Sequence, residues 1–217
     1  MVSRKKELEL ALEKLAEPLS PRRDLEQYPT PAHIAADLLW EEELAGRGLS
    51  GRIVVDLGAG TGRLCIGAAL LGAECVGLEI DERQIRVLLD NARIAGVSER
   101  VEVVLSDVRR PPLRPMDGST AIMNPPFGTS RRGADREFLA AASTLSDRIL
   151  SLHIYNESSL DFLSRFLRSR GFVVVKMKKY TMLLRQTMEH HVAKTVRFPV
   201  VLLVSDKMRE VGVQREA

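Results

Sequence analysis

From residue 52 onward, short apolar runs alternate with stretches whose apolar residues recur at helical spacing, and this alternation constrains the fold more than any other feature. It predicts an α/β fold with a parallel, doubly wound sheet. Several runs are continuously apolar, as in strands covered on both faces. No clear long helix separates the last two runs, so we expect an antiparallel pair at one edge of a seven-stranded, mostly parallel sheet. The predicted strands are 53–57, 75–79, 101–105, 120–123, 148–153, 172–177 and 196–204, and the predicted helices are 62–71, 82–95, 134–146 and 157–169.

The segment before this alternation predicts an N-terminal helical extension. Residues 4–16 have an amphipathic pattern that Pro18 interrupts. A second helix is predicted over 32–46, with Thr30 placed to cap it. We therefore expect one domain, in which 1–50 supplies helices and a covering segment and 51–217 forms the α/β core.

Secretion, a membrane span and a metal site all lack support in the sequence. The N-terminus is charged, and no apolar run approaches the length that crosses a bilayer. Neither Cys65 and Cys75 nor His153, His190 and His191 belong to a cluster of metal-ligand residues. We expect a cytoplasmic protein with no metal, in which both cysteines are reduced core residues, although a disulfide stays possible.

The first predicted strand runs into a glycine loop with the spacing G-x-G-x-G, formed by Gly58, Gly60 and Gly62. The dinucleotide fingerprint has G-x-G-x-x-G and brings a helix N-terminus against a pyrophosphate. Here Asp56 precedes the loop, and its carboxylate would repel a pyrophosphate but suits the ammonium group of an amino acid. The alternative is a plain turn between a strand and a helix, where glycines also occur.

Two further acids follow the next two predicted strands. Glu79 could accept hydrogen bonds from both ribose hydroxyls of a nucleoside, and Asp107 could accept from an adenine amine. Ile80 and Val108 could enclose the adenine ring. Each acid alone could be a solvent-facing cap, but ligands of open α/β sheets bind at this edge. Three acids at successive strand ends predict a site for S-adenosylmethionine.

The fourth predicted strand ends in Asn124-Pro125-Pro126-Phe127, which we interpret as a catalytic tetrapeptide. An exocyclic amine is a poor nucleophile, so its protons need acceptors, and the side-chain oxygen of Asn124 and the carbonyl of Pro125 are suitable. The prolines make the turn rigid. Phe127 can stack on a base. The alternative is a turn that merely ends a strand, with Phe127 in the core.

Positive charge is concentrated between residues 168 and 197, where eight lysines and arginines stand against Glu189 alone. Such a segment favours a polyanion, although a solvated basic face explains it equally well. A loop after the tetrapeptide adds two arginines that could steer phosphates. The residues expected to contact RNA are Arg131, Arg132, Lys176, Lys178, Lys179, Arg185, His190, His191 and Lys194.

These residues together resemble class I methyltransferases of the amino-group type, which have a Rossmann-like fold. The closer resemblance is to the methyltransferase-like five family of ribosomal RNA adenine-N6 methyltransferases. Ala59 and Thr61 stand where eukaryotic relatives are expected to have cysteines, which suggests a prokaryotic or archaeal type, and the ribose acid is Glu79 rather than aspartate. The resemblance rests on Leu25-Glu26-Gln27-Tyr28-Pro29-Thr30, Asp56 to Gly62, Asn124-Pro125-Pro126-Phe127-Gly128-Thr129, Ser151-Leu152-His153 and, less closely, His191 to Val200.

The resemblance implies features that the residues alone do not show. Gln27, Tyr28 and Thr30 are expected to fold over the donor pocket, where the sequence by itself favours a polar linker. A small zinc-binding activator subunit is expected to pair with the edge strand near Val101–Leu105. The implied reaction is N6-methylation of an adenine in structured RNA, most of all ribosomal RNA.

Other functions share the tetrapeptide chemistry. DNA adenine-N6, RNA guanine-N2 and protein glutamine-N5 methyltransferases use similar motifs, and the last two commonly have tyrosine in place of Phe127. No separate target-recognition domain is visible, which disfavours sequence-specific DNA modification. A non-catalytic RNA-binding module is a further alternative, which the intact acids and Asn124 oppose.

Overall fold

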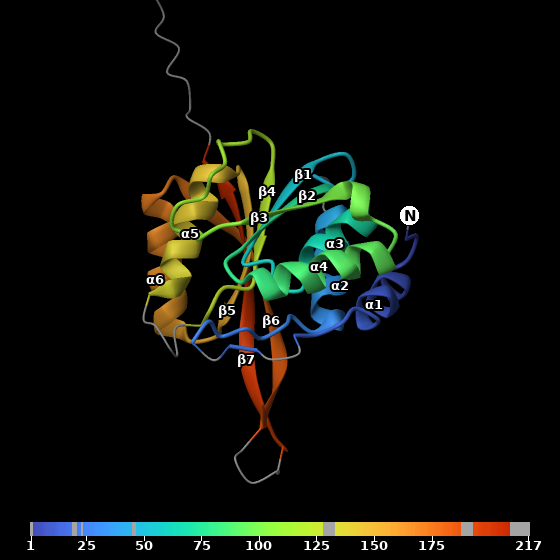
Figure 1. Ribbon diagram of the computed structural model, residues 1–217. Coiled ribbons are helices and arrows are strands. Elements are labelled where there is room, and N and C mark those ends of the chain that lie inside the picture. Colours follow the sequence, from blue (N-terminus) through green and yellow to red (C-terminus); the bar gives the residue numbers. More distant parts are fainter. Residues whose placement is uncertain are drawn as a thin grey trace, which may run out of the picture.

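The computed structural model describes residues 2–18, 21–22, 24–44, 47–127, 133–187 and 193–208. Seven strands form one sheet in the order β3-β2-β1-β4-β5-β7-β6, with helices on both faces (Figure 1). The strands are β1 (Ile53–Leu57), β2 (Glu74–Glu79), β3 (Val101–Leu105), β4 (Thr120–Met123), β5 (Arg148–Ile154), β6 (Phe172–Thr187) and β7 (Ala193–Lys207). The helices are α1 (Lys5–Glu13), α2 (Ala32–Leu44), α3 (Arg63–Leu70), α4 (Glu82–Ile94), α5 (Ala134–Leu145) and α6 (Glu157–Ser169), with a 3₁₀ turn η1 (Ser98–Arg100).

The predicted architecture is confirmed. Strands β3, β2, β1, β4 and β5 are parallel, and β7 runs antiparallel to both β5 and β6. One apolar core lies between the sheet and α1, α2, α3 and α4, and the other lies under α5 and α6 (Figure 1). The N-terminal helices thus contribute to the main core. None of the described helices has both the length and the apolar character needed to cross a bilayer.

A buried ion pair fastens α2 to the sheet. Arg148, at the start of β5, donates from Nη2 to Glu42 Oε2 of α2 at 2.8 Å and from Nη1 to Asp206 Oδ1 of β7 at 2.7 Å. Glu42 is 3% exposed and Arg148 is 8% exposed. Because an unpaired charge in the interior is costly, these contacts fix where α2 can pack.

The strands β6 and β7 are longer than the predicted 172–177 and 196–204. They pair from Phe172↔Lys207 to Thr187↔Ala193, and their far ends extend as a hairpin beyond the rest of the sheet, downward in Figure 1. A β-bulge between Val174 and Lys176 interrupts the alternation of side chains. The added residues mix lysines, arginines and polar side chains with apolar ones such as Met182, which packs in the first core, and this mixed composition explains why both strands were predicted too short.

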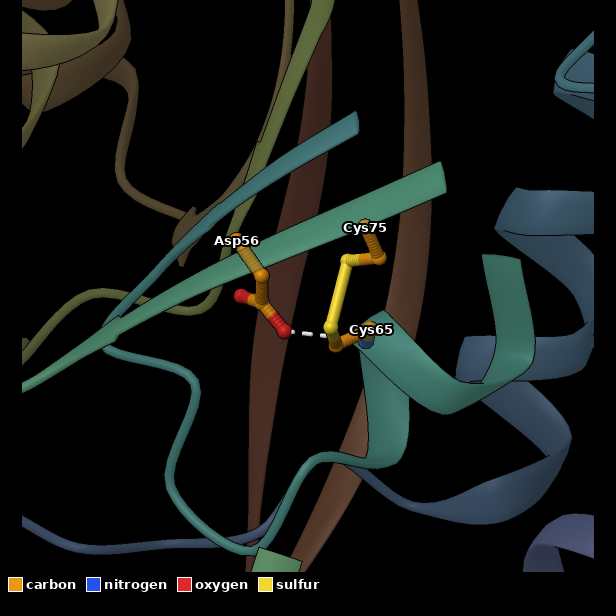
Figure 2. The surroundings of a disulfide bond; sticks show 3 residues. All are labelled: Asp56, Cys65 and Cys75. Carbon is orange, nitrogen blue, oxygen red and sulfur yellow. Dashed lines mark hydrogen bonds between the residues drawn. A yellow bond between two sulfur atoms is a disulfide. The ribbon is translucent and has the colours of Figure 1, made fainter. Parts of the chain in front are cut away.

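The expectation that both cysteines are reduced is wrong. Cys65 of α3 and Cys75 of β2 form a disulfide across the first core, with their Cα atoms 5.7 Å apart (Figure 2). That separation lies in the range that a disulfide spans. The packing of α3 against the sheet creates this proximity, and a spacing of ten residues in the sequence does not reveal it.

Candidate active site

A cavity of about 390 Å³ opens at the C-terminal ends of β1, β2, β3 and β4. Its size is ordinary for a small-molecule site. All of the residues predicted to bind the cofactor line it, except Gly62. The predicted residues in its wall are Gln27, Tyr28, Thr30, Asp56, Gly58, Gly60, Glu79, Ile80, Asp107, Val108 and Asn124.

The glycine loop brings backbone close to the cavity. Gly58 has φ of 73°, and a Cβ there would lie 2.8 Å from Cε1 of Phe138. A side chain at Gly58 would therefore be strained and would displace the aromatic ring. Gly62 has another role, since a Cβ there would lie 2.6 Å from Cγ of Leu88 in α4. Gly62 lets α3 begin close to α4 and does not face the ligand space.

Asp56 is buried at the end of β1, with one carboxylate oxygen engaged. Its Oδ2 accepts from the backbone N–H of Cys65 at 2.9 Å (Figure 2). Its Oδ1 is buried and has no hydrogen-bond partner among the described residues. Burial raises the pKa of Asp56 to about 7, while the hydrogen bond from Cys65 opposes this rise. An ammonium group in the cavity would supply the missing partner of Oδ1.

Glu79, at the end of β2, holds the backbone around it. Its Oε2 accepts from the N–H of Gly60 at 2.8 Å, and its Oε1 accepts from Ile80 and Asp81, each at 2.9 Å. Burial raises the pKa of Glu79, against these hydrogen bonds. The carboxylate thus joins the glycine loop to the start of α4, and Oε2, which accepts one of these three hydrogen bonds, has a lone pair left for a ligand.

The carboxylate of Asp107, which follows β3, accepts hydrogen bonds from Arg109. The Nε of Arg109 donates to its Oδ1 at 3.0 Å and to its Oδ2 at 2.9 Å, and the N–H of Arg109 donates to Oδ1 at 2.9 Å. Val108 between them is buried and lines the cavity. The carboxylate is therefore oriented by local contacts at the cavity wall.

The segment around Gln27 lies against the cavity, as the resemblance implied. Gln27 donates from Nε2 to Asp81 Oδ2 at 3.0 Å and accepts at Oε1 from Gln84 at 3.2 Å. Both contacts tie the segment to the start of α4. The carbonyl of Tyr28 accepts from Nδ2 of Asn124 at 3.2 Å. The covering segment is thus joined to the tetrapeptide.

The contact with Tyr28 orients the Asn124 amide. Because Nδ2 is the donor to Tyr28, Oδ1 remains the acceptor, and it is buried without a hydrogen-bond partner among the described residues. Pro125 is buried, and Pro126 lines the cavity. Oδ1 of Asp56 and Oδ1 of Asn124 are thus both buried oxygens of the cavity wall to which no described residue donates a hydrogen bond.

The ring of Phe127 packs against neighbouring side chains. It makes an edge-to-face contact with Phe198 of β7, with centroids 5.5 Å apart and planes at 72°. It also packs against the first core, and it does not belong to the cavity wall. The ring is therefore held beside the cavity by the base of the hairpin.

Apart from Lys179, the residues predicted to contact RNA divide into three groups. Lys176 pairs with Glu41, and Lys178 pairs with Asp37 and Glu41 of α2. Although burial opposes ionisation, hydrogen bonds from Lys178, Lys5 and Tyr180 lower the pKa of Asp37 to about 2. Arg185 and Lys194 lie in the extended part of the hairpin, where only the backbone is described. Arg131, Arg132, His190 and His191 lie outside the described residues.

Lys179 is in a different setting from Lys176 and Lys178. Its Nζ lies 3.8 Å from the centroid of the Tyr155 ring, directly after β5. A cation over an aromatic face is attracted by the ring without a carboxylate partner. Lys176 and Lys178 pair with acids of α2, whereas the described contact of the Lys179 ammonium group is with an aromatic ring.

Sequence reasoning missed several residues of the cavity wall. Glu26 is buried with a left-handed backbone, φ 49°, which is uncommon outside glycine. Arg63 is the first residue of α3 and is 8% exposed. Phe138 comes from α5 and packs against Gly58. No spacing signal marks these residues, because three separate elements bring them together.

The fold and the site define a class I methyltransferase. The profile of the ribosomal protein L11 methyltransferase (PrmA) family matches residues 38–118, which hold the glycine loop and the acids that follow it. The crystal structure of a candidate RNA methyltransferase from Pyrococcus horikoshii is similar with a TM-score of 0.87 at 37% identity, covering 96% of this chain and 100% of that one.

Two relatives narrow the class to a family. Over 215 residues the chain is 33% identical to an uncharacterized protein of Methanocaldococcus jannaschii, covering 94% of this chain and 95% of the relative. Over 154 residues it is 38% identical to the rRNA N(6)-adenosine-methyltransferase METTL5 of Danio rerio, covering 68% of this chain and 73% of the relative. The chain belongs to the METTL5-like family of rRNA N6-adenosine methyltransferases.

Proposed function

We propose that this protein transfers a methyl group from S-adenosylmethionine to N6 of an adenine in structured RNA, with ribosomal RNA as the substrate. The observation that carries the proposal is the buried, oriented Oδ1 of Asn124 at a cavity that Asp56, Glu79 and Asp107 also line. Family membership supplies the choice of base.

The residues of the cavity fit the proposed cofactor. Oδ1 of Asp56 would accept from the ammonium group, Oε2 of Glu79 from a ribose hydroxyl, and Asp107 from the adenine amine. Glycine is needed at position 58 of the cavity wall, because φ is 73° and a Cβ would lie 2.8 Å from Phe138, so a side chain would displace another residue of the wall. When bound, S-adenosylmethionine supplies an electrophilic methyl group on its sulfonium sulfur.

The tetrapeptide performs the positioning that the reaction needs. Oδ1 of Asn124 and the carbonyl of Pro125 would accept the two N–H groups of the adenine amine, which favours a tetrahedral nitrogen with an available lone pair. Proline at 125 has no N–H that could compete. The proton that leaves after transfer passes to water, so alignment and electrostatics supply the rate enhancement without a strong base.

RNA would lie across the catalytic edge of the sheet and along the hairpin. Lys179 stands at this edge, because β6 pairs Lys179 with Val201 and β5 pairs His153 with Val201. We propose that Lys179 contacts phosphate together with Arg131, Arg132, Arg185, His191 and Lys194. Lys176 and Lys178 would contribute less, because Glu41 and Asp37 pair with them.

We also propose that β3 binds a small zinc-binding activator subunit. Strand β3 is at the edge of the sheet and pairs only with β2 within the described chain. Leu105 of β3 is 59% exposed, and unpaired apolar edges favour strand addition. Leu105→Glu should abolish co-purification with the activator, whereas Leu44→Glu, at a residue 69% exposed on α2, should not. Equal recovery of the activator with both variants would contradict this interface.

The proposed reaction is tested by mass spectrometry of nucleosides from RNA treated with the protein and labelled S-adenosylmethionine. We expect N6-methyladenosine, and loss of the acceptor in Asn124→Ala should lower the rate by roughly 10²- to 10³-fold. Cofactor affinity should change by less than about threefold, roughly 0.7 kcal/mol. Asn156→Ala, which removes the N-cap contact of α6 outside the cavity, is the matched control.

The same labelling, applied in parallel to RNA, DNA and ribosomal protein, separates the alternatives. Labelled N2-methylguanosine in RNA, N6-methyladenine in DNA only, or N5-methylglutamine in protein would refute the proposed substrate. Full activity of Asn124→Ala would remove Asn124 from the mechanism.

A further inference from the structure

The charge of the cavity wall is uneven. Five acids line it, Asp24, Glu26, Asp56, Glu79 and Asp107. Two cations line it among the described residues, Arg63 and Arg109, and Arg109 is engaged by Asp107. An amino-acid moiety has a carboxylate as well as an ammonium group, and a carboxylate is repelled by acids. A ligand of this kind therefore needs a cation, and Arg63 is the buried one.

Arg63 has hydrogen-bonding capacity left inside the cavity wall. Its Nη1 donates to the carbonyl of Thr30 at 2.9 Å, and its Nη2 reaches Oε1 of Glu17 at 3.5 Å. Its Nε is buried and has no hydrogen-bond partner among the described residues. The residue is 8% exposed. A buried N–H of a guanidinium without an acceptor indicates a place where a ligand acceptor belongs.

The position of Arg63 in the fold matches this need. It is the first residue of α3, so the positive end of the helix adds to its own charge. Asp56, whose free Oδ1 would hold an ammonium group, ends the strand that precedes α3. The β1–α3 unit therefore presents a carboxylate and a guanidinium group to the same cavity.

We propose that Arg63 binds the carboxylate of the methionine moiety of S-adenosylmethionine, while Asp56 binds its ammonium group. This inference rests on the proposed cofactor and assigns a residue that no motif marks. Because Arg63 also holds the carbonyl of Thr30, the bound carboxylate stabilises the covering segment, which joins Asn124 through Tyr28. Arg63 is a binding and positioning residue, and it does not contact the reacting methyl group.

The experiment compares three ligands that share the adenosine part and differ in the groups on sulfur. S-adenosylmethionine has both the ammonium and the carboxylate group, decarboxylated S-adenosylmethionine lacks the carboxylate, and 5′-methylthioadenosine lacks the whole amino-acid end together with the sulfonium charge. Dissociation constants are measured by isothermal titration on the full chain, without RNA, so the readout does not depend on activity. The proteins are the wild type, Arg63→Met, Arg63→Lys, Asp56→Asn and, as a control on the exposed face of α4, Arg86→Met.

We expect Arg63→Met to lower the affinity for S-adenosylmethionine by roughly 10- to 100-fold, which is the effect of losing a charge-assisted hydrogen bond. The same variant should change the affinity for decarboxylated S-adenosylmethionine by less than about threefold, and Arg63→Lys should restore part of the loss. Asp56→Asn should lower the affinity for both ligands that have an ammonium group. None of the variants should change the affinity for 5′-methylthioadenosine, and Arg86→Met should change the affinity for none of the three ligands.

The affinities of Arg63→Met for the three ligands are compared with one another, because general damage to the cavity would lower the affinity for every ligand. A loss of stability in this variant therefore cannot be mistaken for the specific effect. Equal loss of S-adenosylmethionine and its decarboxylated form would assign Arg63 a structural role and overturn the inference. Unchanged affinity for S-adenosylmethionine would overturn it as well. A wild-type protein that binds none of the three ligands would refute the proposed cofactor itself.

Discussion

Replacing Asp56 by asparagine tests the electrostatics of the cavity in the free protein. The carboxyl is buried at 1% exposure, accepts one hydrogen bond from Cys65 and has a second oxygen without a partner. Burial raises its pKa from 3.8 to about 7. Asparagine can keep the hydrogen bond from Cys65, and it removes the titration. The variant therefore separates the charge of Asp56 from its shape.

The sign and size of the effect follow from linkage. Between pH 4 and pH 7 the folded chain binds a proton that the unfolded chain has released, so stability falls as pH rises through this window. Each pKa unit corresponds to about 1.36 kcal/mol. With a folded pKa of about 7, the wild type should lose about 2.5 kcal/mol between pH 5 and pH 8 relative to Asp56→Asn.

Urea-induced unfolding of both proteins at pH 5, 6, 7 and 8 measures this difference. Subtracting the two free energies at each pH removes the titration of groups that both proteins share. One such group is His153, whose pKa burial lowers to about 4. A constant difference across the series would show that Asp56 titrates as an exposed carboxyl, and the reasoning about its buried charge would be wrong. Saturating S-adenosylmethionine should reduce the pH dependence, because an ammonium partner favours the ionised form.

Three further changes test the structure. Glu42→Ala leaves Arg148 with less compensation in the interior and should lower the free energy of unfolding by about 3–5 kcal/mol, and a loss below about 1 kcal/mol by urea unfolding would contradict a buried pair. Gly58→Ala should destabilise the chain by about 1–3 kcal/mol in thermal unfolding and weaken S-adenosylmethionine in titration, and retained affinity would refute the need for close backbone approach. Replacing both Cys65 and Cys75 by alanine should lower stability by about 2–4 kcal/mol, measured against the wild type with and without reductant. If reductant did not affect the wild type, the cysteines would not be disulfide-bonded in solution.

Strand ends were the part of the site that sequence could predict. An apolar run marks a parallel strand, and the residues around its C-terminal end lie at the ligand-binding edge of the sheet. Asp56, Glu79, Asp107 and Asn124 each lie within two residues of such an end, and all four line one cavity. The rule uses only local pattern and chain direction, so no long-range contact has to be known.

Residues whose positions depend on distant packing could not be predicted. In the sequence, Lys178 looks like an unpaired basic residue. In the fold it pairs with Asp37 and Glu41, which lie more than 130 residues earlier in the chain. The Cys65–Cys75 disulfide requires α3 to pack against β2. In the sequence, Arg63 looks like an ordinary charged residue at the start of a helix. Only its burial and its Nε, which has no partner among the described residues, distinguish it from an exposed arginine.

The tetrapeptide combines both kinds of information. Its chemistry is local, since an amide and a proline carbonyl at a strand end supply acceptors in any such fold. Its orientation is not, because the amide is set by the carbonyl of Tyr28, 96 residues earlier, and Phe127 is set by Phe198 of the hairpin. A base could therefore meet the face of Phe127 only while β7 holds that ring beside the cavity. Under the proposed reaction, selection of the amine would thus depend on the covering segment and the hairpin as much as on the four residues themselves.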